Sequence, residues 1–385
     1  MLLCSTAALL PLRAQQAAWL DSIETYNTGL RALRGETEAL RQASRTALRL
    51  PDPEAEVAYY FGSPKGVPAR TNVSVSQSLD WGVITGRQRT LARAADRVNE
   101  ETYRAARQQV LADAGAKIVH VVYYNRLCAE LRQRVALCDK LLELYREKAA
   151  QGEANAIEPQ KIEVQAAIAR AGLSRAENER GALLTALRGL NGGRPVVCAD
   201  TSYEASPLPT LDHVLRQVDT AHPLVRQAEA AVGVSREQLR VAQAESWPEL
   251  SVGFSGEYIK NNNYSGVSLG LSIPLWGNSR AEVRRRKAEQ VARQLDVDDR
   301  RTQLRAAVSE QYASAIALQA TADRLRKTIG HDTSPQLLRR ALEEGQMALP
   351  EYIMELSFYY EARTALLEAE RDAQLAREAV AALMR

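Results

Sequence analysis

The sequence predicts a mainly α-helical chain that carries two β-hairpins, arranged as two tandem copies of one helix–hairpin–long helix–helix unit. Two observations predict this fold. Stretches of alternating apolar and polar residues are each followed by a long, charged, proline-free stretch, and these are the periodicities of a strand and of a helix. The same order of elements then occurs a second time along the 385 residues, which indicates an internal duplication.

The clearest hairpin lies at 249–276. Its first strand alternates Leu250, Val252 and Phe254 with serine and glycine, and 264–275 repeats this alternation after an asparagine-rich turn that suits positive φ. Two strands of about ten residues with one apolar face are typical of a transmembrane β-barrel strand pair. A soluble edge hairpin has the same pattern, so the rest of the chain must decide between them.

An equivalent hairpin at 55–82 supports the duplication. Both hairpins end in Trp-Gly, at Trp81-Gly82 and at Trp276-Gly277, and these pairs lie 195 residues apart. The following helix, at 87–150, contains no proline and one internal glycine. At 1.5 Å per residue it would be roughly 95 Å long, which requires a coiled coil or an elongated bundle.

The expected boundaries follow from these elements. A short apolar run before Leu12-Arg13-Ala14 predicts a secretory signal, although it lacks a basic start, and Cys4 leaves lipidation as an alternative. Single helices are expected at 17–50 and 210–246. The predicted organisation is a signal peptide at 1–14; a first repeat at 15–193 with hairpin 55–82, long helix 87–150 and return helix 158–190; a linker at 194–210; and a second repeat at 211–385 with hairpin 249–276, long helix 279–330 and return helix 350–384.

Composition excludes several classes of function. The formal net charge of +3 does not indicate nucleic-acid binding. The sequence contains no run of 18 apolar residues, so no transmembrane helix is expected. Cys128 and Cys138 lie too far apart on one helix for a disulfide. The four histidines have no metal-ligand spacing, and no nucleophile motif or cofactor motif is present. An enzyme is therefore not supported, whereas a soluble periplasmic coiled-coil adaptor or scaffold remains an alternative.

The hairpins require partners. Four strands cannot close a barrel, and an open sheet edge is not tolerated in hydrocarbon, so the chain is expected to oligomerise. Trp81, Trp247 and Trp276 all lie where a strand meets a helix, and tyrosines lie near the turns, as in the two aromatic belts of a membrane barrel. Scattered aromatics of a soluble sheet are the alternative. Basic clusters that suit lipid phosphates, or an ordinary solvated helix face, follow at Arg87, Arg89, Arg93, Arg280, Arg284, Arg285, Arg286 and Lys287.

The repeated pattern, the strand pair S-V-G-F-S…V-S-L-G-L-S-I-P-L-W-G-N and the glycine tips at Gly152 and Gly345 together resemble the TolC family of Gram-negative outer-membrane exit ducts. The resemblance implies a homotrimer that forms a twelve-stranded β-barrel on a periplasmic α-helical barrel. It also implies outer-membrane lipid, a periplasmic adaptor and an inner-membrane pump of the RND type as partners. The second tip is similar to the heavy-metal (CusC/CzcC-like) branch, which implies metal cations as cargo; drug efflux and type I secretion are alternatives.

The resemblance also implies the candidate sites. In the family, acidic residues after each tip ring the periplasmic aperture. Here Glu158 and Glu351 each follow a tip glycine by six residues, and Glu355 takes the place of a carboxylate that the family has at the position of Met354. A solvated helix face is the alternative. The expected adaptor contacts, which also suit plain loop reversals, are Gly152, Glu153, Ala154, Asn155, Gly345, Gln346, Met347 and Ala348.

Overall fold

The computed structural model of the chain describes residues 12–46, 48–64, 66–153, 155–203, 207–260, 262–272, 279–329 and 334–385. These residues form two compact units. We call the unit of Ala32–Ala105 and Thr220–Gln303 the hairpin unit, and the unit of Met1–Arg31, Ala106–Asp219 and Leu304–Arg385 the helical unit. The two longest helices, α4 (Arg87–Ala150) and α8 (Ser279–Ile329), contribute residues to both units.

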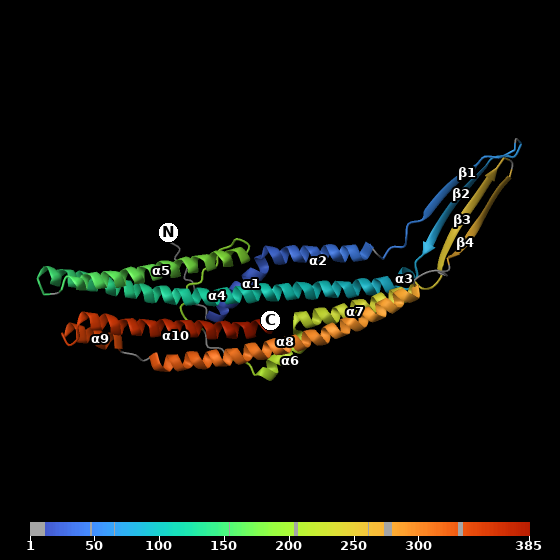
Figure 1. Cartoon of the computed structure of the whole chain (residues 1–385). Helices are drawn as coiled ribbons and strands as arrows, with labels where there is room; N and C mark the ends of the chain where they lie inside the picture. The colour runs from blue at the N-terminus through green and yellow to red at the C-terminus, as the bar shows by residue number, and fades with distance from the viewer. Residues whose placement is uncertain are drawn as a thin grey trace, which may run out of the picture. The chain divides into compact units, whose positions relative to one another are not determined.

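The hairpin unit is built around a four-stranded antiparallel sheet in the order β1-β2-β3-β4 (Figure 1). Each predicted hairpin forms, and the two hairpins also pair with each other through β2 and β3, where Val75 lies opposite Phe254. The sheet is therefore where the two sequence repeats meet. The strands are β1 (Glu54–Tyr60), β2 (Arg70–Leu79), β3 (Glu249–Ile259) and β4 (Asn262–Ser272).

Helices join the sheet without a long connection. The short α3 (Trp81–Ile84) follows β2, and its first N–H groups are capped by the carboxylate of Asp80. Polar contacts tie the helices of this unit together: the Gln227 Nε2 donates to Thr102 Oγ1 at 2.8 Å. The remaining helices of the hairpin unit are α2 (Thr28–Thr46), α7 (Pro223–Ala244) and the first parts of α4 and α8.

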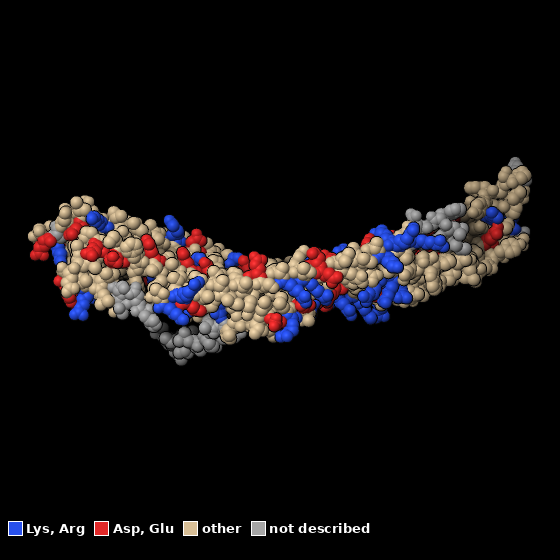
Figure 2. All heavy atoms as spheres, turned by 60° about the horizontal axis from the view of Figure 1, so that its bottom comes forward, with Lys and Arg blue, Asp and Glu red and all other residues tan. Residues whose placement is uncertain are grey.

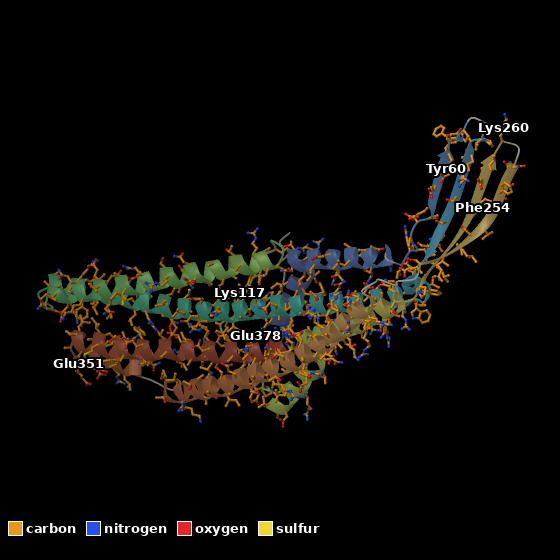
Figure 3. The ribbon with its side chains drawn as sticks, turned by 45° about the vertical axis from the view of Figure 1, so that its right-hand side comes forward. Tyr60, Lys117, Phe254, Lys260, Glu351 and Glu378 are labelled. Carbon is orange, nitrogen blue, oxygen red and sulfur yellow. The ribbon has the colours of Figure 1, made fainter. Side chains whose placement is uncertain are left out.

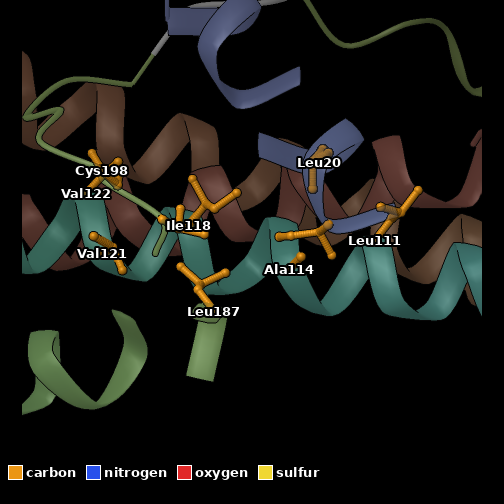
Figure 4. Close-up of a cluster of buried hydrophobic side chains, with 10 residues drawn as sticks. Leu20, Leu111, Ala114, Ile118, Val121, Val122, Leu187 and Cys198 are labelled. Atoms are coloured by element: carbon orange, nitrogen blue, oxygen red, sulfur yellow. The ribbon is translucent and has the colours of Figure 1, made fainter. Parts of the chain in front are cut away.

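The helical unit has an elongated core made of several separate clusters of buried side chains. The cluster in Figure 4 brings together residues of α1, α4 and α5 and the segment after α5: Leu20, Ile23, Leu111, Ala114, Ile118, Val121, Val122, Leu187, Val196 and Cys198. The helices of this unit are α1 (Leu12–Tyr26), α5 (Ile157–Leu190), α6 (Leu211–Ala221), α9 (Ser334–Glu343), α10 (Leu349–Leu383) and the later parts of α4 and α8. No described helix combines the length and the apolarity needed to cross a membrane.

The single helices expected at 17–50 and 210–246 are wrong, because each is divided into two. The first breaks at Asn27, whose Oδ1 accepts from the Leu30 N–H at 2.9 Å and starts α2. The second breaks at His222, whose Nδ1 accepts from the Leu224 N–H at 3.3 Å, and proline at position 223 begins α7. The short helix α9 before the second tip was not predicted either.

The segment 194–210, expected to be a linker, is non-helical in its described part but is not free of the core. Val196 and Cys198 are buried in the cluster of Figure 4. The Asn125 side chain of α4 donates to the carbonyls of Cys198 and Asp200, at 3.0 and 2.9 Å. This segment therefore fixes α5 to α4. The expected signal peptide lies largely outside the described residues, and its last three residues form the start of α1.

Candidate functional site

The two faces of the sheet differ in chemistry. Strand register places Val75, Phe254 and Val267 side by side on one face, and the next row along the strands, with Ser74, Ser255 and Gly266, on the other. Figure 3 labels Phe254 and Tyr60, which belong to opposite faces. The apolar face is open to the surroundings in the single chain: Val267 is 81% exposed and Leu269 is 77% exposed.

The polar face is predominantly anionic. By register it carries the carboxylates of Glu54, Glu56, Glu249 and Glu257, and Arg70 is the one strand cation on it among the described residues. The Arg70 Nη1 lies 3.1 Å from Glu257 Oε1. The remaining three glutamates of this face are not balanced by a strand cation, so the face has a net negative charge.

The edges of the sheet are open. Within the described residues β1 pairs only with β2, and β4 pairs only with β3. The outer rows of backbone N–H and C=O groups on these two strands therefore have no sheet partner, and such edges are able to pair with another chain. A sheet with one exposed apolar face and two open edges is complete only when both are covered.

Two of the three tryptophans proposed for a membrane belt lie together where the sheet meets the helices. The rings of Trp81 and Trp247 are 6.0 Å apart in an edge-to-face arrangement. The Trp81 Nε1 donates to the Pro248 carbonyl at 2.6 Å, which fixes the indole beside the start of β3. Trp247 is 61% exposed. Trp276 lies outside the described residues.

Near these rings, Glu245 directly follows the last residue of α7, and its side chain is exposed. Partial desolvation, followed by the neighbouring charge of Asp80, raises the pKa of the Glu245 carboxyl. Acidic groups alone do not make a metal site, and among the described residues no group of His, Cys, Asp and Glu side chains is arranged to hold a metal ion.

The two predicted tips lie at the same end of the helical unit (Figure 1) and have the same backbone turn. Gly152 has φ +78° and Gly345 has φ +72°, values that side chains other than glycine rarely adopt. At both tips the N–H three residues after the last helical residue bonds back to the helix: Glu153 N to Lys148 O and Gln346 N to Ala341 O, each at 2.8 Å. This is the Schellman pattern of helix ends.

The tip residues differ in exposure. Gly152, Glu153 and Asn155 are exposed, and the Asn155 Oδ1 accepts from the Ile157 N–H at 3.1 Å at the start of α5. At the second tip Gly345, Gln346 and Ala348 are exposed, whereas Met347 is partly buried. Met347 packs against the cluster of Leu142, Tyr145, Ile162, Leu349, Tyr352 and Leu356, which holds the two tips together. Ala154 lies outside the described residues.

The three candidate aperture carboxylates are not equivalent. Glu351 and Glu355 are exposed on α10, and together with Met354 and Phe358 they follow one side of the helix (Figure 3 labels Glu351). The opposite side of this helix carries the buried Tyr352 and Leu356. Neither Glu351 nor Glu355 has a hydrogen-bond or ion-pair partner in the described chain.

Glu158 occupies the first turn of α5 and is half-buried. Its charge contributes, after burial, to a raised pKa of the Tyr145 hydroxyl. Glu158 is thus partly withdrawn from solvent beside the cluster that joins the tips, whereas Glu351 and Glu355 face outward. The structure therefore leaves two free carboxylates on the second repeat and one screened carboxylate on the first.

Sequence reasoning missed a buried charge network that ties the helices of this unit together. Glu370 of α10 is 8% exposed and accepts from Arg126 of α4 and from Arg326 of α8. The counterparts of Glu370 and Arg326 in the first repeat are Glu177 and Arg132, which also form an ion pair, 193 and 194 residues earlier in the chain.

Comparison with known proteins places these features in a family context. Residues 214–384 match the family described as outer membrane efflux protein. No significant relative is found among curated proteins. The fold of the described chain is similar to several solved structures.

A membrane protein from Pseudomonas aeruginosa aligns with a TM-score of 0.76 and 19% identity over 96% of this chain and 93% of its own. CusC aligns with a TM-score of 0.76 and 15% identity over 96% and 92%. The open state of the Neisseria gonorrhoeae MtrE outer membrane channel aligns with a TM-score of 0.75 and 20% identity over 96% and 89%. At these identities the likeness is one of fold.

Proposed function

We propose that three copies of the chain form the exit duct of a tripartite efflux system. Residues 214–384 match the outer membrane efflux protein family, and the fold is similar to that of a solved outer membrane channel. The sheets of the three chains would close one twelve-stranded barrel in the outer membrane, and the helices would extend into the periplasm. The protein is a channel and not an enzyme. A periplasmic adaptor and an inner-membrane pump of the RND type would hand the cargo to it.

The observation that carries this proposal is the four-stranded sheet with its apolar face and its open edges. A lipid bilayer supplies apolar surroundings for one face, and lateral pairing with two further copies satisfies the edges. The polar face then lines an aqueous interior. A soluble coiled-coil scaffold, the alternative interpretation of the sequence, would leave the apolar side chains of Val267 and Leu269 exposed to water, which is energetically unfavourable.

We assign metal cations as the cargo class on the basis of charge. The polar sheet face carries Glu54, Glu56, Glu249 and Glu257 against Arg70. In the helical unit, Glu351 and Glu355 have no cationic partner among the described residues. Rings of carboxylates in a pore favour cations and repel anions. The similarity to CusC is compatible with this choice, but MtrE is equally similar in fold.

The channel proposal is tested by purifying the full chain from outer membranes and inserting it into a planar bilayer. A heat-modifiable trimer that conducts ions is the expected result. A protein that is recovered from the periplasm without detergent, or that gives no conductance after insertion, would contradict it. Deleting the gene tests the cargo: increased sensitivity to transition-metal salts is expected, and increased sensitivity to drugs alone would replace metal efflux by drug efflux.

The exposed tip residues Gly152, Glu153, Asn155, Gly345 and Gln346 are proposed to contact the adaptor. Replacing both tips by unrelated loops of equal length that keep the two glycines should abolish efflux while leaving the amount of outer-membrane trimer unchanged. Site-specific cross-linking from position 153 or 346 should capture the adaptor. Normal efflux after both replacements would reject the contact, because the tips would then be plain loop reversals.

A further inference from the structure

The hairpin unit carries a group of exposed cations at the start of each long helix. We define the basic collar as Arg87, Arg89 and Arg93 of α4 with Arg280, Arg284 and Lys287 of α8. All six side chains are exposed, and none has an ion pair or side-chain hydrogen bond within the part of the chain that the structure describes. Figure 2 shows Lys and Arg gathering over the helices that adjoin the sheet.

The cations are placed where helix energetics disfavour them. Arg89 and Arg93, like Arg280 and Arg284, are spaced i,i+4, and like charges at this spacing repel by about 0.2–0.5 kcal/mol. Arg87, Arg89 and Arg280 also lie in the first turns of their helices, where the backbone dipole favours anions. The first turn of α4 contains no acidic residue, whereas that of α8 contains Glu282. An anion from outside the chain would reverse both penalties.

Two other arginines in the same region do not share this property. Arg285 lies 2.5 Å from Glu282 and 2.7 Å from Glu289, and Arg286 lies 2.9 and 3.1 Å from the same two carboxylates. The hydrogen bond from Arg285 lowers the pKa of Glu282 to about 2, so this partner stays ionised. The cluster expected from the sequence at 280–287 therefore divides into unpaired and satisfied cations.

The unpaired cations have equivalent positions in the two repeats. Arg89 and Arg284 are 195 residues apart, which is the offset of the two Trp-Gly pairs. In each repeat the collar begins within eight residues of the last strand residue, since β2 ends at Leu79 and β4 ends at Ser272. Along a helix Arg87–Arg93 and Arg280–Lys287 each span about 10 Å. Both repeats thus place the first collar residue at the same separation along the sequence, eight residues after the last strand residue.

We propose that the basic collar binds the phosphate groups of anionic phospholipids in the periplasmic leaflet of the outer membrane. This inference rests on the proposed membrane insertion of the sheet. The headgroup layer is about 5–8 Å deep on each side of the hydrocarbon, and the collar, which spans about 10 Å along each helix, would overlap this layer when the strands lie in the hydrocarbon. A flat lipid surface also explains why both repeats carry the cations at the same level, whereas a protein partner does not need that symmetry.

The experiment compares two variants that each remove two cations per chain from α8. Arg284→Ala/Lys287→Ala removes collar residues, and Arg285→Ala/Arg286→Ala removes the satisfied pair as a matched control. Each full-length trimer is reconstituted in phosphatidylcholine vesicles that contain brominated phosphatidylglycerol or brominated phosphatidylcholine. Quenching of tryptophan fluorescence gives the relative affinity of the two lipids for the protein surface.

The wild type should bind phosphatidylglycerol more tightly than phosphatidylcholine, by up to about fivefold for each contributing cation. This preference should weaken as salt is added. The collar variant should lose most of this lipid preference, and the further substitutions Arg89→Ala/Arg93→Ala should abolish it. The control variant should have the same lipid preference as the wild type. Equal preference in the collar variant and the control, or no preference in the wild type, would overturn the proposal.

Conductance in pure phosphatidylcholine separates this inference from the channel proposal. A collar variant that conducts normally there is folded and inserted, so its lipid preference is a valid test. If no form of the protein conducts, the channel proposal has failed instead. A collar variant that keeps the lipid preference but loses binding of a purified adaptor would assign the collar to a protein partner and reject the lipid.

Discussion

The two sequence repeats form the same ion pair in two different environments. In the first repeat Arg132 and Glu177 lie 2.5 Å apart and are 51% and 42% exposed. In the second, Arg326 and Glu370 lie 2.9 Å apart, but Glu370 is 8% exposed and is also bound by Arg126. The duplicated residues therefore retain their pairing while their energetic importance differs, because the value of an ion pair depends on how far water is excluded.

The largest expected effect comes from breaking the buried member of this comparison. Glu370→Ala should lower the free energy of unfolding by about 1–3 kcal/mol, because Arg126, whose side chain is 21% exposed, loses its acceptor, whereas Arg326 keeps its ion pair with Asp323. Glu177→Ala, the matched variant in the first repeat, should cost only a few tenths of a kcal/mol. Chemical denaturation in detergent measures both. Equal losses would mean that burial does not distinguish the two pairs.

The tips should behave alike, which makes them a control for the comparison. Gly152→Ala and Gly345→Ala each force a side chain into a left-handed conformation, φ +78° and +72°. Each should reduce stability by about 1 kcal/mol. Because both tips share the Schellman pattern, a difference between the two variants of more than about half this value would show that their turns are not equivalent in solution.

The helix breaks differ in a way that depends on pH. Asn27 and His222 lie 195 residues apart and both cap a helix, but only histidine titrates near neutral pH. Burial lowers the pKa of His222, so its contribution to stability is present above the unfolded value of about 6.5 and is lost as pH falls through the folded pKa.

His222→Asn should therefore keep the cap and flatten the decline in stability as the solution is acidified below about pH 6.5. Unfolding midpoints measured over that range for the variant and the wild type give the difference directly. Asn27→His in the first repeat is the reciprocal variant and should introduce a new acid sensitivity. Parallel pH profiles for the wild type and His222→Asn would show that another group is responsible.

The smallest expected effect concerns the carboxylates after the tips. Glu351→Ala should increase the conductance of the closed trimer and reduce its cation selectivity, because an exposed carboxylate without a partner is removed from the constriction. Glu158→Ala should change both less, since Glu158 is half-buried beside Tyr145. Reversal potentials in a salt gradient measure selectivity. Unchanged conductance and selectivity for Glu351→Ala would assign Glu351 to an ordinary solvated face.

Periodicity and the repeat offset were sufficient to predict the fold class, both hairpins and the helix that begins at Arg87. They did not predict the breaks at Asn27 and His222, because these depend on how a single side chain caps a backbone N–H. They also did not predict that β2 pairs with β3, since pairing between distant strands leaves no mark on local alternation. The separation of Arg284 from Arg285 was also missed, although the spacing of α8 contains it: Arg285 lies three residues from Glu282 and four from Glu289, whereas Arg284 has neither spacing to them.

The exposed sheet also sets a condition on how the protein reaches its final state. A lone chain would present Val267, Leu269 and Phe254 to water beside two open strand edges, which is the combination that promotes aggregation. For the channel proposed above, the concentration of unassembled chains must therefore stay low, or a holding chaperone must cover the strands. Because neither face nor edge is satisfied by one copy, that proposal requires bilayer insertion and trimer assembly to be coupled steps, and the yield of channels should depend steeply on the supply of chains.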